Sequence, residues 1–209
     1  MDTGHFKWSG LMKILFLGPP DSPLIDFIKT CGDQIIQTMD VLDQGTVSAW
    51  GPEFMISYSY RHILKKNILD MFENKAINLH IAYLPWNRGA DPNFWSFIDG
   101  TPKGVTIQFL DEGIDSGDII AQKEVTFTKN ETLKTSYEKL QLALQDLFKR
   151  HWVSIRNGDC PRKSPKVAGT FHLKKDKEPL LFLLKDGWDT PVCILEEHGQ
   201  KPRNKNERT

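Results

Sequence analysis

The sequence predicts an α/β fold in which helices cover both faces of a mostly parallel, twisted sheet. Short apolar runs recur along the chain without the alternation of a half-exposed strand, as in KILFL at residues 13–17. Such runs are typical of strands that are buried on both faces. Segments with helical spacing of apolar residues stand between the runs, in the order that βαβ units produce.

The first strand, at residues 13–17, ends at the turn GPPDS. Asp21 or Ser22 can cap the next helix, with Pro23 in its first turn. A strand, a tight turn and a helix begin many nucleotide-binding α/β folds, but the Gly-x-Gly-x-x-Gly fingerprint is missing here. Pro19 and Pro20 also lack the N–H groups that would hold a pyrophosphate, so we expect no tightly bound NAD.

The later elements follow from the same patterns. Further strands are expected at residues 34–38, 54–57, 76–79, 104–109 and 119–126. Helices are expected at residues 63–72 and 93–99, and a long amphipathic helix that packs across the sheet at 133–155. Residues 40–52 are polar and rich in turn formers, which predicts a surface connection.

These elements divide the chain into four parts. They are a leader or expression remnant at 1–12, a main α/β domain at 13–165, a small C-terminal lobe at 166–195 and a disordered tail at 196–209.

Composition excludes several functions. Lysine plus arginine and aspartate plus glutamate number 27 each, whereas a nucleic-acid-binding protein usually has a basic excess. Cys31, Cys160 and Cys193 lie far apart without metal-ligand spacing, which predicts free thiols in a reducing compartment and no metal site. No apolar run approaches the ~18 residues that a membrane span needs. We therefore expect a cytoplasmic protein that binds neither nucleic acid nor membrane.

The chemistry is concentrated in residues 76–120. Asn78 and His80 are two residues apart on an expected strand, so their side chains point to the same side. An amide and an imidazole form a donor pair for a developing oxyanion, and the imidazole also moves protons near neutral pH. A carboxylate of DEGIDSGD, at 111–118, can orient the histidine.

No serine or cysteine stands in a nucleophile-elbow context, so the pattern favours direct attack of an amine on an acyl donor. In the alternative interpretation, these polar groups only satisfy buried backbone groups at the strand ends. His62, at a junction between loop and helix, is catalytic in principle but suits a structural role as well.

Four motifs, in order and correctly spaced, resemble the formyltransferases that use N10-formyltetrahydrofolate. They are Asn78-Leu79-His80, YLPWNRGADP at 83–92, Gly104-Val105-Thr106 and DEGIDSGD at 111–118. A weaker likeness at 169–178 matches the segment that ends the family's catalytic domain. The resemblance implies a Rossmann-like formyltransferase fold and a catalytic triad of Asn78, His80 and Asp115, with Asp111 as the alternative carboxylate.

The resemblance also implies where the folate donor lies. By matching position, it lies between the segment with Tyr60, Arg61 and Ile63 and the turn with Asp111, Glu112 and Gly113. Backbone groups there are expected to bind the pterin ring.

The acceptor amine is inferred from the form of the motifs. YLPWNRGADP and GWDTP at 187–191 look more like the sugar N-formyltransferases, while only about sixty residues follow the long helix, too few for the tRNA-binding barrel of methionyl-tRNA formyltransferase. The resemblance thus implies a nucleotide-linked amino sugar, such as a dTDP- or GDP-linked aminodideoxyhexose, used in polysaccharide or O-antigen synthesis.

Trp86 and Arg88 are the candidate substrate contacts, although Arg88 suits a structural ion pair equally well. A homodimer is expected by family analogy. The alternatives are an enzyme that acts on another amine, like methionyl-tRNA formyltransferase, and a non-catalytic relative that binds folate or nucleotide sugar.

Overall fold

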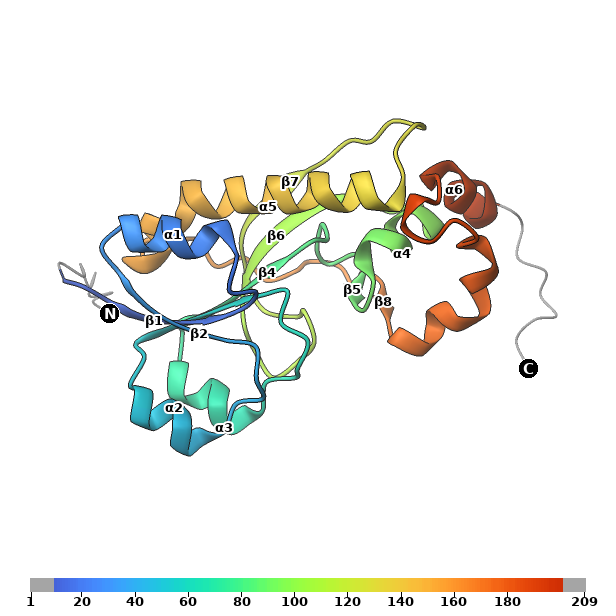
Figure 1. The fold of residues 1–209 in the computed structure, drawn as a ribbon. Helices are drawn as coiled ribbons and strands as arrows, with labels where there is room; N and C mark the ends of the chain where they lie inside the picture. Colours follow the sequence, from blue (N-terminus) through green and yellow to red (C-terminus); the bar gives the residue numbers. More distant parts are fainter. Residues whose placement is uncertain (1–9, 201–209) are drawn as a thin grey trace.

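The computed structural model describes residues 10–200, which form a twisted sheet with helices on both faces (Figure 1). The six strands of the sheet are β1 (Lys13–Leu17), β2 (Gln34–Thr38), β3 (Phe54–Tyr58), β4 (Ala76–His80), β6 (Gly104–Phe109) and β7 (Ile119–Glu124). Their order is β2-β1-β3-β4-β6-β7. The pairings are parallel from β2 to β4 and antiparallel from β4 to β7. The predicted α/β fold with a mostly parallel sheet is confirmed.

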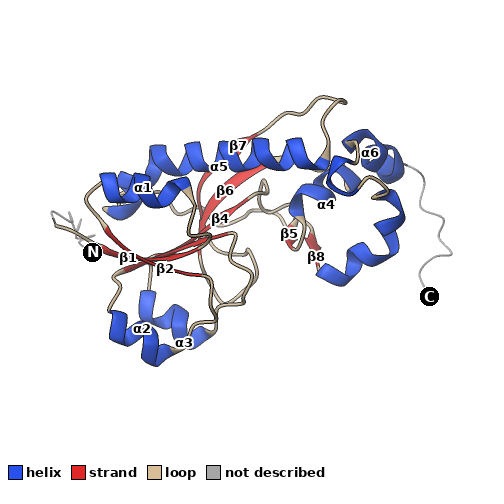
Figure 2. Cartoon of the chain, viewed as in Figure 1, coloured by secondary structure: helices blue, strands red, loops and turns tan. Residues whose placement is uncertain are grey.

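Helices cover the two faces of this sheet (Figure 2). One face carries α1 (Pro23–Thr30) and α5 (Leu133–Arg156), and the other carries α2 (Gln44–Trp50), α3 (Lys66–Leu69) and the short 3₁₀ helix η1 (Asp70–Phe72). Because β1 is covered on both sides, its successive side chains Ile14 and Leu15 are both fully buried, in different cores. The helix α5 packs across β4, β6 and β7, as its long amphipathic pattern predicts.

Local capping explains where two helices begin. The Ser22 side chain accepts a hydrogen bond from the Leu24 N–H, so the predicted cap of α1 is Ser22 rather than Asp21. Thr132 caps α5 in a reciprocal pair with Thr135.

Two predictions for the connections were wrong. Residues 40–52 contain the helix α2, which Asp43 caps; its only buried side chain is Val47, so no apolar stripe marked it. The helix predicted from residue 63 begins at Lys66 instead, because Ile63 faces solvent with 80% of its surface exposed.

The C-terminal part packs at one end of the sheet (Figure 1). It contains β8 (Phe171–His172), the 3₁₀ helices η2 (Lys174–Leu183) and η3 (Gly187–Asp189), and α6 (Val192–Gln200). Two elements of the main domain lie against it, β5 (Arg88–Gly89) and α4 (Pro92–Ile98). The lobe predicted for residues 166–195 shares a core with α4 of the main domain, since Val192 and Leu195 are buried against Phe94 and Phe97.

The predicted terminal segments need correction where the structure describes them. The tail was placed at 196–209, but residues 196–200 complete α6, and Glu196 pairs with Lys103 at 3.7 Å. Residues 201–209 lie outside the described part, as do residues 1–9 of the predicted leader. Met12 belongs to the core: it is 1% exposed and its N–H donates to the Asp33 carboxylate. Between residues 10 and 200, no helix is long and apolar enough to cross a bilayer.

Candidate active site

Asn78 and His80 lie on β4, where the parallel part of the sheet meets the antiparallel part. Their partners on β6 are Gln108 and Thr106. Alternation along the strand places both side chains on the same side, as the sequence predicts. His80 is the last residue of β4, and ligands of open α/β sheets commonly bind outside the carboxyl ends of the strands.

Asp115 completes the constellation from the loop between β6 and β7. Its Oδ1 accepts hydrogen bonds from the Asn78 and Gln108 side-chain amides, each at 3.0 Å. Its Oδ2 accepts a hydrogen bond from the Gly89 N–H at 2.9 Å and lies 3.6 Å from Nε2 of His80. The three residues predicted as a triad are therefore adjacent, and three N–H donors at one carboxyl group suit its anionic form.

Asp115 reaches this position through an uncommon backbone conformation. Its φ is +50°, in the left-handed region that non-glycine residues rarely adopt. The side chains of Asp115 and His80 are about equally buried, at 11% and 10% exposed. A buried side chain held by a backbone in this sparsely populated region is typical of functional sites.

Asp111, the alternative carboxylate, has different partners. It accepts hydrogen bonds from the Gly113 N–H at 3.0 Å and from the Ser116 hydroxyl at 2.8 Å. Both partners belong to its own turn. The geometry thus joins Asp115, and not Asp111, to Asn78 and His80.

The imidazole of His80 is held by its Nε2 atom. That atom lies 3.4 Å from the Asn87 carbonyl oxygen and 3.6 Å from Oδ2 of Asp115. Two oxygen acceptors on the same side favour the tautomer with its proton on Nε2. The lone pair of Nδ1 is then the one that accepts a proton.

The two segments predicted to hold the folate are joined by one ion pair. Lys66, which follows the loop with Tyr60, Arg61 and Ile63, contacts the Glu112 carboxylate at 2.5 Å. This hydrogen bond is the main reason that the pKa of Lys66 is raised.

Within the loop, Tyr60 is hydrogen-bonded to the backbone of a distant segment, whereas the residues after it are exposed to solvent. The Tyr60 hydroxyl donates to the Asp40 carbonyl oxygen at 2.6 Å, and the His62 ring packs edge-on against the Tyr60 ring. Burial raises the pKa of the Tyr60 hydroxyl. Arg61 and Ile63 are exposed, and Ile114 on the other segment is 43% exposed. The assignment of these residues to folate binding stays a prediction.

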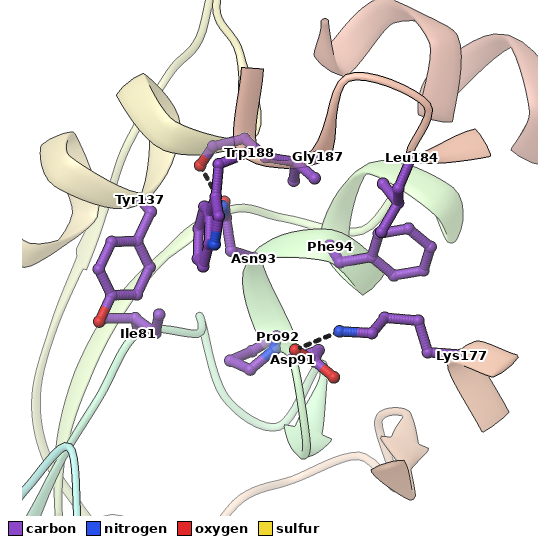
Figure 3. A pocket seen from close by; sticks show the side chains of 11 residues that line it. Ile81, Asp91, Pro92, Asn93, Phe94, Tyr137, Lys177, Leu184, Gly187 and Trp188 are labelled. Atoms are coloured by element: carbon purple, nitrogen blue, oxygen red, sulfur yellow. Dashed lines mark hydrogen bonds and ion pairs between the residues drawn. The ribbon is translucent and has the colours of Figure 1, made fainter. Parts of the chain in front are cut away.

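A cavity of about 360 Å³ opens between α4, α5 and the C-terminal lobe (Figure 3). It is lined by Ile81, Asp91, Pro92, Asn93, Phe94, Leu133, Tyr137, Lys177, Leu184, Gly187 and Trp188. Ile81 directly follows the catalytic candidate His80 in the chain, but Asn78, His80 and Asp115 are not among the lining residues.

Aromatic and charged groups lie on different sides of this cavity (Figure 3). The Tyr137 and Trp188 rings pack edge-on with centroids 5.3 Å apart, and Trp188 is 59% exposed. Across the cavity, Lys177 pairs with Asp91 at 2.7 Å. The aromatic rings suit a ligand with a planar ring, while the wall opposite carries both a cation and the carboxylate that pairs with it.

Trp86 and Arg88, the predicted substrate contacts, do not line this cavity. Trp86 is half-buried in the turn that contains the cis Leu84–Pro85 bond. Arg88 lies on β5, with its guanidinium 5.8 Å from the Phe171 ring centroid. Their role in substrate binding stays a prediction.

Sequence reasoning missed three groups that hold the triad. They are the Gln108 side chain, the Gly89 N–H and the Asn87 carbonyl. Only Gln108 had a signal in the sequence, because it is a polar residue at a buried position of the apolar run at 104–109. The other two act through the backbone, which the residue type does not reveal.

No group of three or more histidine, cysteine or acidic side chains within residues 10–200 is arranged to hold a metal ion. The three cysteines are free thiols. Burial raises the pKa of Cys31 and of Cys160, which disfavours their reactive thiolate forms.

Comparison with known proteins identifies the family. The sequence model of the formyl transferase family matches residues 36–150, more than half of the chain. This chain belongs to the formyl transferase family. The match includes Asn78, His80 and Asp115, so the adjacent triad lies inside the family's own domain.

A solved relative matches over most of the chain. The crystal structure of the formyltransferase PseJ from Anoxybacillus kamchatkensis is 47% identical, with a TM-score of 0.86, over 90% of this chain and 100% of PseJ. PseJ was crystallised with UDP-4,6-dideoxy-4-formamido-L-AltNAc and tetrahydrofolate.

Curated relatives are longer proteins. Methionyl-tRNA formyltransferase of Thermodesulfovibrio yellowstonii is 34% identical over 70% of this chain and 49% of its own length. The dTDP-4-amino-4,6-dideoxyglucose formyltransferase of Mycobacterium bovis is 38% identical over 51% of this chain and 45% of its own length. The chain therefore spans about half the length of the curated relatives that it matches.

Proposed function

We propose that this formyl transferase moves the formyl group of N10-formyltetrahydrofolate to the amine of a nucleotide-linked amino sugar. The observation that carries the proposal is the contact of Asp115 with both Asn78 and His80. The 47% identity with PseJ, whose structure contains a UDP-linked 4-formamido sugar, favours a UDP-linked 4-amino sugar as the acceptor.

In the proposed mechanism, Asn78 stabilises the oxyanion and His80 transfers the proton. The amine nitrogen forms a bond to the formyl carbon, and the carbonyl oxygen becomes an oxyanion. One N–H of the Asn78 side-chain amide is engaged by Asp115, which leaves the second N–H for that oxyanion. Preorganised donors of this kind stabilise charge that develops only in the transition state.

His80 moves the proton that the reaction displaces. With Nε2 held by Asn87 and Asp115, Nδ1 takes the proton of the attacking amine. The imidazolium that results is stabilised by the adjacent Asp115 carboxylate and donates a hydrogen bond to the oxyanion. When the bond between the formyl carbon and N10 breaks, the proton passes to N10, so the reaction leaves the charges balanced.

The acceptor is proposed to lie in the cavity. We assign the nucleotide base to the Trp188 and Tyr137 rings and the diphosphate to Lys177, which exchanges its Asp91 partner for the phosphate. The amine then lies toward Ile81, the residue that follows His80. Base stacking on an aromatic ring contributes about 1–3 kcal/mol per base.

The test is incubation of the full chain with N10-formyltetrahydrofolate and a panel of acceptors. The panel contains UDP-, dTDP- and GDP-linked amino sugars and methionyl-tRNA, with formyl transfer followed by mass spectrometry. We expect transfer to a UDP-linked amino sugar and its loss in Asn78→Ala and His80→Ala. Transfer to methionyl-tRNA alone, or unchanged transfer in both variants, would contradict the proposal.

We further propose a cytoplasmic homodimer that supplies formylated sugars for polysaccharide or O-antigen synthesis. Leu181 and Phe182 on η2 are more than half exposed, at 52% and 59%, and suit an interface with a second copy. Light scattering of the wild type should give twice the chain mass, and Phe182→Glu should shift it to the mass of one chain. A wild-type monomer at all concentrations would exclude the dimer.

A further inference from the structure

Residues 169–172 lie against the loop at residues 85–90, which contacts His80 and Asp115, although more than 80 residues separate the two segments in sequence. Arg88 and Gly89 of β5 pair with Phe171 and His172 of β8 in a small parallel sheet. The pairing places the C-terminal segment next to residues that contact His80 and Asp115.

Thr170 makes four hydrogen bonds to this loop. Its hydroxyl oxygen accepts from the Asn87 N–H at 2.8 Å, and its hydroxyl donates to the Asn87 side-chain oxygen at 3.2 Å. Its carbonyl oxygen accepts from the Arg88 N–H at 3.0 Å, and its N–H donates to the Pro85 carbonyl oxygen at 3.3 Å. Thr170 therefore fixes both the backbone and the side chain of Asn87.

Asn87 transmits this restraint to His80. It is 1% exposed and has a φ of +56°, a conformation that its surroundings must hold in place. Its side-chain amide donates to the Thr101 hydroxyl at 2.7 Å, and its carbonyl oxygen faces Nε2 of His80 at 3.4 Å. A change in the Asn87 backbone would move the acceptor that sets the His80 tautomer.

The same segment also restrains Asp115. The Gly89 N–H donates to Oδ2 of Asp115, and the next residue, Ala90, donates its N–H to the His172 carbonyl oxygen. A side chain at position 89 would collide with that carbonyl oxygen, so β5 and β8 approach as closely as only glycine allows.

We propose that Thr170 is a positioning residue for formyl transfer. It acts through the Asn87 carbonyl on His80 and through β5 on Asp115, without contact with either substrate. The proposal rests on the proposed function, since it assigns Thr170 a role in the geometry of that site.

The test compares Thr170→Val, Thr170→Ser and His172→Asn in the full chain. Valine keeps the shape of threonine without its hydroxyl, while serine keeps the hydroxyl. His172 is the matched control, because it lies on the same strand but its side chain pairs with Asp99 at 2.7 Å and stacks on Trp95, away from Asn87.

Thr170→Val should lower kcat by about tenfold or more, because small displacements of catalytic groups have large effects on rate. KM for both substrates should change little, and the pH dependence of kcat should shift with the His80 environment. Thr170→Ser should recover most of the activity. His172→Asn should lower the melting temperature but keep kcat and the pH profile of the wild type.

A second readout does not depend on turnover. The ring nitrogen signals of His80, assigned by their loss in His80→Gln, should shift in Thr170→Val and stay in place in His172→Asn. If Thr170→Val does not fold, Thr170→Cys replaces the hydroxyl with a weaker hydrogen-bonding group of similar size.

The result that would overturn the proposal is a Thr170→Val variant that behaves like His172→Asn, with lower stability but wild-type kcat, pH profile and His80 signals. Its failure is distinct from failure of the proposed function. If the wild type formylates no acceptor, the proposed function is wrong. The His80 signals still show whether Thr170 positions the imidazole ring.

Discussion

At the scale of single residues, the site depends on which of two nearby carboxylates reaches the triad. Asp111 and Asp115 stand four positions apart in a polar turn, and residue type does not distinguish them. Their partners do: Asp115 accepts hydrogen bonds from β4, β5 and β6, whereas Asp111 accepts them within its own turn. The catalytic assignment of Asp115 is therefore a prediction with a specific geometric basis.

We expect Asp115→Asn to lower kcat by about 10²–10³, the size of effect seen when one oxyanion donor is removed. The amide puts an N–H group where the carboxylate accepted hydrogen bonds, and it removes the negative charge beside His80. Asp111→Asn should instead raise KM for the formyl donor and change kcat only a few-fold. Steady-state kinetics on both variants decides, and an equal loss of kcat in the two would contradict the assignment of Asp115.

The sequence predicted some residues of the site much better than others. Asn78 and His80 could be predicted together because side chains alternate along a strand, so residues two apart point to the same side. Thr170, Asn87 and Gly89 were not, because they act through hydrogen bonds between segments that are distant in the chain. Strands of two residues, such as β5 and β8, are too short to produce a sequence pattern that would predict their pairing.

At the scale of elements, Tyr58 joins the central sheet to its longest helix. Its hydroxyl donates to the Gln141 side-chain oxygen at 2.7 Å and accepts from the Gln145 side-chain amide at 3.0 Å, and both glutamines lie on α5. Burial raises the pKa of this hydroxyl above its usual value. The folded state therefore favours the protonated phenol more than the unfolded state does.

The consequence is a loss of stability at alkaline pH. The contribution of Tyr58 is fully present below the unfolded pKa of about 10 and is lost as the pH rises through the folded pKa. Tyr58→Phe should cost about 1 kcal/mol at pH 7, since two hydrogen bonds disappear. The difference between wild type and variant should narrow above pH 10 in urea unfolding, and a difference that stays constant with pH would contradict this account.

The six strands of the main sheet were predicted within one or two residues. The apolar runs of β1, β3, β4 and β6 are buried on both faces. Their directions were not predicted in detail: the turn between Phe109 and Ile119 lets β7 return antiparallel beside β6. The helix α2 was missed for the opposite reason, because it contributes one buried side chain to the core and depends on the Asp43 cap.

At the scale of the whole molecule, the cavity lies between the central domain and the C-terminal lobe (Figure 3). Tyr137 comes from α5, whereas Lys177 and Trp188 come from η2 and η3. The proposed acceptor site thus needs both parts of the chain.

Trp188→Ala should raise KM for the nucleotide sugar about tenfold, which corresponds to about 1.4 kcal/mol of lost stacking. KM for the formyl donor should stay the same. Because Trp188 is 59% exposed, the melting temperature should change little, and Trp188→Phe should recover part of the affinity. A rise in KM for the donor instead of the sugar would place the acceptor elsewhere.

The pairing of β5 with β8 has a consequence for the order of events during synthesis. The ribosome releases β4 and its Asn78 and His80 long before it adds Thr170. All six strands and α5 can form on a nascent chain whose His80 still lacks the restraint that Thr170 supplies through Asn87. We therefore expect the restraint on His80 to form late in translation, and a chain that stops before residue 169 should keep the contacts of Asp115 with Asn78 and Gln108 but lose the restraint on Asn87.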